Sequence, residues 1–338
     1  MVASDLEVIP VAMSPQSSAP FALGTFADAA GRTFPGLVVD ERVLDLTDAL
    51  TAGRSRSVLT LVEHWAETLP LLHRLAESAD GSWIAADGLS VRAPIEPRQV
   101  FQAGANYRQH VIDLEVAHRR PDDPRTEEQA RAEIAQVMDR RAAEDLPYVF
   151  LGLPSSITGP YDELVLPAWA AEPDWELELA VVIGRTAHRV SVDQALEYVA
   201  GYTIANDVTE RASVFRRDMP AIGTDWLRSK NAPGFTPLGP YLVPAGFVGD
   251  PQKLQVTLRL NGETMQDEST ADMLFGVARL ISAISETATL LPGDLVLTGS
   301  PAGNGLHWGR LLRDGDVMEG SITGLGVQRT RCVAERAE

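Results

Sequence analysis

The clearest hydrophobic pattern in the chain lies at residues 176–184. Four apolar positions alternate there with a second set of residues: Leu177, Leu179, Val181 and Ile183 against Glu176, Glu178, Ala180 and Val182. Side chains two positions apart share one face of a strand, so this alternation predicts a β-strand. It also places the Glu176 and Glu178 side chains on one face, with their α-carbons roughly 6–7 Å apart.

A helix and a second strand are predicted directly after this strand. Residues 191–200 have the pattern of a short helix, with Ser191 and Gln194 as a capping box and Gly201 as its end. The next strand is predicted over 202–205 and ends at Asn206-Asp207. A strand–helix–strand unit of this kind can bring Asp207 beside the two glutamates.

Residues 1–97 predict a small N-terminal α/β domain. Short apolar runs such as 43–46 are broken by Gly, Pro and Asp, which is typical of strands joined by turns. Apolar residues at helical spacing predict one or two helices over 57–78. The two prolines in 94–97 indicate a linker, so a second, larger domain is predicted over 98–338.

A highly charged segment interrupts the larger domain at about 117–146. Its central part, 125–145, predicts a helix that begins with a capping box of Thr126 and Gln129. The apolar stripe of this helix is thin, and two interpretations stay open: a solvated surface helix, or a mobile lid over a site. The lid interpretation rests on its position directly after a candidate catalytic stretch.

The C-terminal part of the chain is rich in predicted strands and turns. An apolar helix is predicted over 271–290, and a strand over 295–298. The Gly-rich loop at 299–305 resembles an anion cradle only loosely, because it lacks the terminal Lys-Ser/Thr of a phosphate loop. A tight turn between strands is the alternative interpretation of this loop.

Composition narrows the class of protein. The chain has 338 residues, of which 45% are hydrophobic and 22% charged, as in ordinary globular proteins. No run of about 18 apolar residues predicts a membrane span, and residues 1–20 lack the pattern of a secretory signal. The single cysteine, Cys332, excludes an internal disulfide and a cysteine-based zinc cluster. These features predict a cytoplasmic protein.

The charge balance is strongly acidic. The net charge is −18, and the pI is about 4.7. Such a surface repels phosphate backbones, so nucleic acid is not expected as a partner, whereas a hard cation is. The only lysines are Lys230 and Lys253, which makes each of them a candidate for a specific role.

The acidic pair in the predicted strand is the first candidate for chemistry. Ionised carboxylates in an apolar strand are costly unless they are paired or bind a cation. Together with Asp207, Glu176 and Glu178 offer three carboxylates, which suit Mg²⁺, Mn²⁺ or Ca²⁺. A half-exposed strand whose polar residues face water is the alternative. A glycosidase-type pair is excluded, because two carboxylates on one strand cannot flank a bond from opposite sides.

A histidine and a lysine are the next candidates. His110 is followed by Asp113 and Glu115, either of which could orient it as a general base. Lys230 could supply a compact ammonium to a developing oxyanion. An ordinary surface histidine and a solvated lysine are the respective alternatives.

The order and spacing of these segments resemble the fumarylacetoacetate hydrolase family over about residues 98–332. The most specific part is the Asp-x-Glu-x-Glu stretch at 174–178 together with Asn206-Asp207. The other matching pieces are residues 104–110, 154–160, 201–211, 229–230, 237–240, 261–263, 291–294 and 298–303.

The resemblance implies a fold, a cofactor and a set of site residues. The implied fold is α+β, a mixed β-roll decorated with helices, usually assembled as a homodimer. The implied substrates are small keto acids such as acylpyruvates, diketo acids and oxaloacetate. The implied residues are Glu176, Glu178 and Asp207 for Mg²⁺ or Mn²⁺, with Ca²⁺ as a substitute, His110 for the base, and Lys230 and Arg211 for the pocket.

Several departures from the family pattern lie around the expected pocket. Asp113 stands where many relatives carry Glu, Ala212 replaces an Asp, and Val214 replaces a Gln found in some diketone hydrolases. The segment at about 117–146 is longer than usual, and residues 150–154 lack a common Lys. These changes bear on the substrate and the reaction more than on the metal site.

We therefore expect a divalent-metal-dependent hydrolase that cleaves a carbon–carbon bond in a small β-diketo or acylpyruvate-type acid through a stabilised enolate. His110, oriented by Asp113 or Glu115, would activate a water, and Lys230 with Arg211 would stabilise the oxyanion. A decarboxylase, isomerase or hydratase with the same metal–enolate chemistry is the alternative. A non-catalytic ligand-binding relative is a third possibility.

Overall fold

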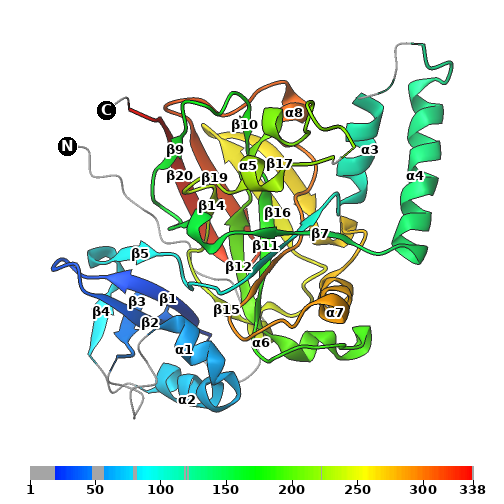
Figure 1. Ribbon diagram of the computed structural model, residues 1–338. Coiled ribbons are helices and arrows are strands. Elements are labelled where there is room, and N and C mark those ends of the chain that lie inside the picture. The colour runs from blue at the N-terminus through cyan, green and yellow to red at the C-terminus, as the bar shows by residue number, and fades with distance from the viewer. Residues whose placement is uncertain are drawn as a thin grey trace.

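A computed structural model describes residues 20–47, 57–78, 82–117, 119, 122–221 and 223–336. Its centre is a six-stranded mixed sheet (Figure 1). In spatial order the strands are β15 (Val243–Pro244), β12 (Val199–Asn206), β11 (Leu177–Ile183), β18 (Leu295–Leu297), β6 (Val100–Gly104) and β7 (Tyr148–Gly152). All neighbours are antiparallel except β18 and β6, which are parallel.

A second sheet of five strands packs against the central one. Its order is β17 (Glu263–Ser269), β16 (Gln255–Leu260), β19 (Val317–Ile322), β20 (Gly326–Ala334) and β9 (Leu164–Leu166). Two short pairs complete the strands of this part: β14 (Thr236–Pro237) with β8 (Ile157–Thr158), and β10 (Pro173–Asp174) with β13 (Thr209–Glu210). The predicted mixture of helices and strands is confirmed, and the description of it as a roll stays a prediction.

The N-terminal part has its own sheet. Its antiparallel strands are β4 (Trp83–Ala85), β3 (Arg42–Asp45), β2 (Thr33–Val39), β1 (Ala22–Ala27) and β5 (Ser90–Arg92). The helices predicted over 57–78 are present as α1 (Val58–Glu63) and α2 (Trp65–Glu77). The last strand of this sheet ends at Arg92, before the predicted boundary at residue 97. That boundary stays a prediction.

The N-terminal sheet and the central sheet share one hydrophobic cluster. Leu23 of β1 exchanges two backbone hydrogen bonds with Leu242, at 2.9 and 2.8 Å, and its side chain is fully buried. Ala180 and Val182 of β11 belong to the same cluster. The predicted linker at 94–97 is also packed, because only 1% of Ile95 is exposed.

The two faces of β11 have different neighbours. Its odd-numbered residues, from Leu177 to Ile183, pack in the core cluster that includes Val256 of β16 and Met318 of β19. Its even-numbered residues face the N-terminal cluster, and Glu178 lies at the end of that face. Because both faces are covered, the whole of β11 is buried, and the half-exposed strand considered from the sequence is wrong.

Two predicted helices differ from the structure. Residues 192–198 form a 3₁₀ helix (Val192–Tyr198), and the Ser191 hydroxyl donates to the Gln194 side chain instead of capping the backbone. Gly201 does not end this helix but lies inside β12, where a side chain would collide with the Val243 carbonyl. The helix predicted over 271–290 is shorter, α7 (Val277–Thr287), and follows a 3₁₀ turn (Thr270–Asp272).

The charged segment contains one helix, α4 (Glu127–Glu144), which packs antiparallel to the preceding helix α3 (Arg108–Ala117) at one edge of the molecule (Figure 1). The predicted capping box of Thr126 and Gln129 is confirmed. Only Ala130 and Met138 of α4 are fully buried among its side chains. Of the described helices, none is long and apolar enough to cross a bilayer.

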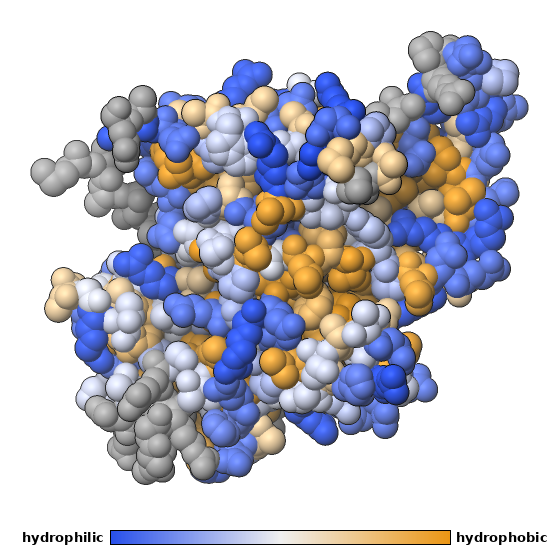
Figure 2. Space-filling model, in the orientation of Figure 1, coloured by the Kyte–Doolittle hydropathy of each residue, from blue (hydrophilic) through white to orange (hydrophobic). Residues whose placement is uncertain are grey.

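Short helices complete the fold: α5 (Trp226–Lys230), α6 (Ala245–Val248) and α8 (Gly305–Trp308). Apolar side chains gather at the centre of the face drawn in Figure 2, where β7 and α5 lie, whereas α4 is mostly polar. Leu151 of β7 and Leu227 of α5 are exposed by 63% and 69%.

Candidate metal centre

Three predicted acidic residues meet where β11 and β12 lie side by side. Leu177 pairs with Asn206, and Glu178 pairs with Ala205. Beyond this register, the Asp207 amide donates to the Glu176 carbonyl at 2.8 Å. The backbone therefore holds Glu176, Glu178 and Asp207 together, and each offers a carboxylate oxygen within 4.8 Å of the others.

Lys230 lies inside this acidic group and is buried, which excludes the solvated surface lysine considered from the sequence. Its Nζ is 2.6 Å from Glu176 Oε2 and 2.6 Å from Asp207 Oδ2. It also donates to the Asp207 carbonyl at 2.9 Å. Burial alone would lower the pKa of Lys230, but the carboxylates of Asp207 and Glu176 raise it, so the side chain stays an ammonium.

Arg211 provides the second positive charge. Its guanidinium binds Asp174 Oδ2 at 2.8 Å and Glu176 Oε1 at 2.7 Å. Asp174 is fully buried and also accepts from the Gly305 amide at 2.5 Å. The sequence placed Asp174 in the family motif but gave it no role, and the structure shows that it anchors Arg211.

The Gly-rich loop holds carboxylates of the protein itself. The Gly299 amide donates to Glu178 Oε2 at 2.7 Å, and the Gly305 amide donates to Asp174. The backbone amides of the loop therefore bind anions, but these anions are carboxylate side chains of β10 and β11 rather than phosphate.

The charges of the group do not balance. Four carboxylates, those of Asp174, Glu176, Glu178 and Asp207, face only two cations, Lys230 and Arg211. If all are ionised, the excess equals the charge of one divalent ion. Three clustered oxygen donors with this excess fit Mg²⁺ or Mn²⁺.

The proton affinities of the carboxylates reflect this imbalance. Burial and the neighbouring Asp207 raise the pKa of Glu178 well above its ordinary value. Burial also raises the pKa of Asp207 to about 6, although the Lys230 ammonium opposes this shift. Burial would raise the pKa of Glu176 as well, but Arg211 and Lys230 hold it below its ordinary value. A site that disfavours its own negative charge favours a bound cation.

His110 lies in the first turns of α3 and is half-buried, unlike an ordinary surface histidine. Burial lowers its pKa, although the Glu176 carboxylate opposes this and Arg211 adds to it. Among the described residues, no side chain is hydrogen-bonded to His110. Asp113 instead accepts from Gln109 at 2.8 Å and pairs with Arg131 at 2.7 Å.

One residue at the centre has no predicted role. Gln102 of β6 is buried, and its Nε2 donates to Asp207 Oδ1 at 2.6 Å. It comes from a part of the chain 105 residues away from Asp207. No local pattern around Gln102 indicates this contact.

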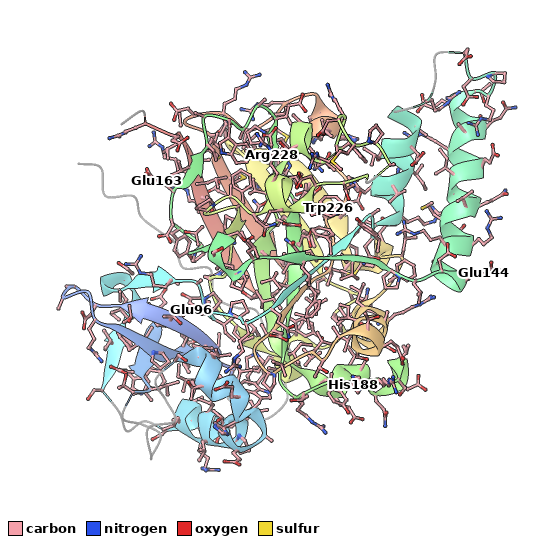
Figure 3. The ribbon with its side chains drawn as sticks, in the orientation of Figure 1. Glu96, Glu144, Glu163, His188, Trp226 and Arg228 are labelled. Carbon is pink, nitrogen blue, oxygen red and sulfur yellow. The ribbon has the colours of Figure 1, made fainter. Side chains whose placement is uncertain are left out.

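An aromatic group borders the lysine. The Trp226 ring, labelled in Figure 3, stacks on Phe150 of β7 at 4.3 Å. Its Nε1 donates to the Tyr148 hydroxyl at 2.6 Å. Lys230 Nζ lies 5.9 Å from the centre of the Phe150 ring. The outer side of α5 borders a surface hollow of about 510 Å³, which none of the predicted site residues lines.

Comparisons with known proteins agree with this geometry. The family described as fumarylacetoacetate hydrolase, C-terminal, matches residues 99–333. A 2,4-didehydro-3-deoxy-L-rhamnonate hydrolase from Sphingomonas sp. (strain SKA58) is 48% identical over 186 residues, 54% of this chain and 64% of that protein. A human mitochondrial oxaloacetate tautomerase is 43% identical over 183 residues, 54% of this chain and 57% of that protein. The chain thus spans less than two thirds of either relative.

A solved structure shows the same fold. The maleylpyruvate hydrolase from Sphingobium sp. SYK-6, in complex with manganese(II) and pyruvate, superimposes with a TM-score of 0.69 at 24% identity. The match covers 93% of this chain and 100% of that one. With the family match over residues 99–333, the chain belongs to the fumarylacetoacetate hydrolase family.

Proposed function

We propose that this protein is a divalent-metal-dependent hydrolase that cleaves a carbon–carbon bond in a small β-diketo or acylpyruvate-type acid. The observation that carries the proposal is the cluster of Glu176, Glu178 and Asp207 within 4.8 Å, next to the buried Lys230 ammonium. The name of the Sphingomonas relative describes a 2,4-diketo acid, which is a substrate of this chemical class.

The three clustered carboxylates would hold Mg²⁺ or Mn²⁺. When bound, such an ion supplies Lewis acidity that polarises keto oxygens and stabilises enolate charge. With a divalent ion bound, Lys230 and Arg211 would bring the four carboxylates to a net charge of zero. The site would then not repel an anionic substrate such as a keto acid.

His110 is the proposed base. A lowered pKa keeps its imidazole neutral near pH 7, so it can take a proton from water. The water oxygen then bonds to the distal carbonyl carbon, the carbon–carbon bond breaks, and its electron pair leaves on the pyruvate-type enolate. Lys230, together with Arg211, stabilises the negative oxygen of the tetrahedral intermediate.

Asp113 has an indirect part in this proposal. Its contacts to Gln109 of α3 and Arg131 of α4 join the two helices next to His110. Asp113 is therefore a positioning residue for the histidine. Glu115 is exposed on the same helix, which makes it the weaker candidate of the two acids.

A second candidate function is isomerisation, with decarboxylation and hydration as variants of the same enolate chemistry. The oxaloacetate tautomerase relative favours it, since that activity needs proton transfer to and from a keto acid but no hydrolytic water. The residues that would hold the ion and move the proton are the same in both functions.

Product analysis separates the candidates. The protein, loaded with Mg²⁺ or Mn²⁺, is incubated with acylpyruvates, sugar-derived 2,4-diketo acids and enol-oxaloacetate. Two carboxylic acids from one diketo acid support the hydrolase, whereas loss of enol absorbance without cleavage, or release of CO₂, supports the alternative. Ion binding without turnover of any compound would support the non-catalytic interpretation.

Three further properties belong to this proposal. We propose that the protein is a homodimer, which light scattering after gel filtration would measure. We also propose a cytoplasmic location. The proposed ligands are small keto acids and the metal ion. The net charge of −18 supports the absence of nucleic acid as a partner.

A further inference from the structure

Gln102 is held in one orientation by the carboxylate next to it. Its Nε2 donates to Asp207 Oδ1 at 2.6 Å, while Lys230 Nζ donates to Asp207 Oδ2 at 2.6 Å. A flipped amide would put its oxygen against the carboxylate, which repels it, so the orientation follows from chemistry. Both oxygens of Asp207 are therefore fixed by donors from opposite sides.

This orientation leaves an acceptor of Gln102 without a partner. Its Oε1 is buried, and no described residue donates to it. An unpaired buried acceptor is costly, and native structures keep one only where something else compensates. The compensating contact here is the charge-assisted hydrogen bond to Asp207.

The space for the Gln102 side chain depends on a glycine in the neighbouring strand. A Cβ on Gly152 of β7 would lie 2.7 Å from Gln102 Oε1 and 2.9 Å from its Cδ. Real Cβ atoms do not approach that closely, so any larger residue at position 152 would displace the carboxamide. The Gln102 side chain of β6 therefore occupies space that is free because position 152 of β7 is a glycine.

From these contacts we infer that Gln102, with the space left by Gly152, is a positioning residue for the metal ligand Asp207. The inference rests on the proposed ion site. Without the Gln102 donor, the Asp207 carboxylate is free to rotate toward Lys230 and pair with it more fully. The ion would then have to compete with the ammonium for the same oxygen.

The test is the affinity for Mn²⁺, measured by calorimetry without substrate. Gln102→Met keeps the size of the side chain but removes the donor, and we expect a loss of about 10–100-fold, the usual cost of changing a group that orients a ligand. Gly152→Ala should lower the affinity in the same direction. Gln328→Met is the matched control, because Gln328 is also buried but donates to the Pro237 carbonyl on β14.

A double-mutant cycle separates positioning from general damage. Gly152→Ala should lower Mn²⁺ affinity in the wild-type background but not in a Gln102→Ala background, where no carboxamide remains to be displaced. Additive effects, or wild-type affinity in Gln102→Met, would overturn the inference. If the wild type itself binds no Mn²⁺, the proposed ion site fails and the positioning role fails with it.

Discussion

At the scale of single residues, the candidate centre has fewer cationic side chains than carboxylates, so each cation pairs with two of them. Lys230 serves Glu176 and Asp207, and Arg211 serves Asp174 and Glu176. Among the described residues, Glu178 has no cationic partner and accepts a hydrogen bond from the Gly299 amide. Burial and the neighbouring Asp207 raise the pKa of Glu178 well above its ordinary value, so a bound cation would interact favourably with this carboxylate.

Glu178→Gln should abolish ion binding and turnover. The amide keeps the shape of the side chain but removes the charge that attracts the cation. We expect Mn²⁺ affinity to fall by more than about 100-fold, beyond the usual cost of changing an orienting group. Calorimetric titration with Mn²⁺ measures this loss, and full activity of the variant in a chelator would contradict the proposed centre.

The rate should depend on pH through His110. Burial lowers its pKa below the ordinary value of about 6.5, so the neutral, proton-accepting form persists to lower pH. We expect kcat/KM of the metal-loaded protein to reach half of its plateau at a pH below the ordinary histidine value of about 6.5. His110→Asn should lose about 10²–10⁴-fold in rate and lose this acidic limb, while its Mn²⁺ affinity stays that of the wild type.

At the scale of elements, the sequence predicted the strands of the site better than their surroundings. Alternation at 177–183 indicates β11, and the paired strands bring Asp207 to Glu176 as expected. The roles of Gln102 and Gly299 could not be predicted, because they act across strands that are distant in sequence. The 3₁₀ geometry of residues 192–198 was not predicted, because the sequence pattern of this segment does not distinguish a 3₁₀ helix from a short α-helix.

The helix α4 is attached to the molecule by both apolar and polar contacts, and Met138 packs in the core cluster with Ile134 against it. Arg108 pairs with Asp139, Arg131 with Asp113, and Arg141 donates to the Ala105 carbonyl. Exposed ion pairs are worth about 0–1 kcal/mol each. The apolar contacts of α4 add to these ion pairs, and the lid interpretation stays a prediction.

Thr126→Ala should loosen this helix without unfolding the protein. The substitution removes the N-cap hydrogen bond to Gln129 and should cost about 0.5–2 kcal/mol. Hydrogen exchange should become faster for the amides of α4 while the core strands keep their protection. Glu144→Ala, at the other end of the same helix (Figure 3), is the control and should not speed exchange. Equal exchange in wild type and Thr126→Ala would contradict the expectation.

At the scale of the whole molecule, the N-terminal sheet and the central sheet depend on each other. Leu23, Leu37 and Leu242 pack in one cluster with Ala180 and Val182 of β11. The face of β11 that ends in Glu178 is thus supported by residues from the first 40 of the chain. Residues on both sides of the predicted boundary at residue 97 contribute to this core.

Leu23→Ala should therefore destabilise the entire protein. Removing a fully buried leucine costs about 2–5 kcal/mol, and the shared cluster transmits that cost to both sheets. Calorimetry should show one unfolding transition at a lower Tm. Ile84→Ala, in the partly exposed strand β4, should change the free energy of unfolding by less than about 0.5 kcal/mol. Two separate transitions would show that the sheets unfold independently.

The ammonium between Glu176 and Asp207 has a consequence for assembly. In small zinc domains the free energy of ion binding drives folding, so chelation denatures them. Here Lys230 already offsets part of the repulsion between the Glu176 and Asp207 carboxylates, so we expect the pocket to form before an ion binds. Refolding in excess EDTA should give a native far-ultraviolet spectrum and a Tm within a few degrees of the untreated protein, whereas Lys230→Met should refold poorly under the same conditions. We therefore expect Lys230 to act as a counterion that lets the protein fold before a metal ion binds.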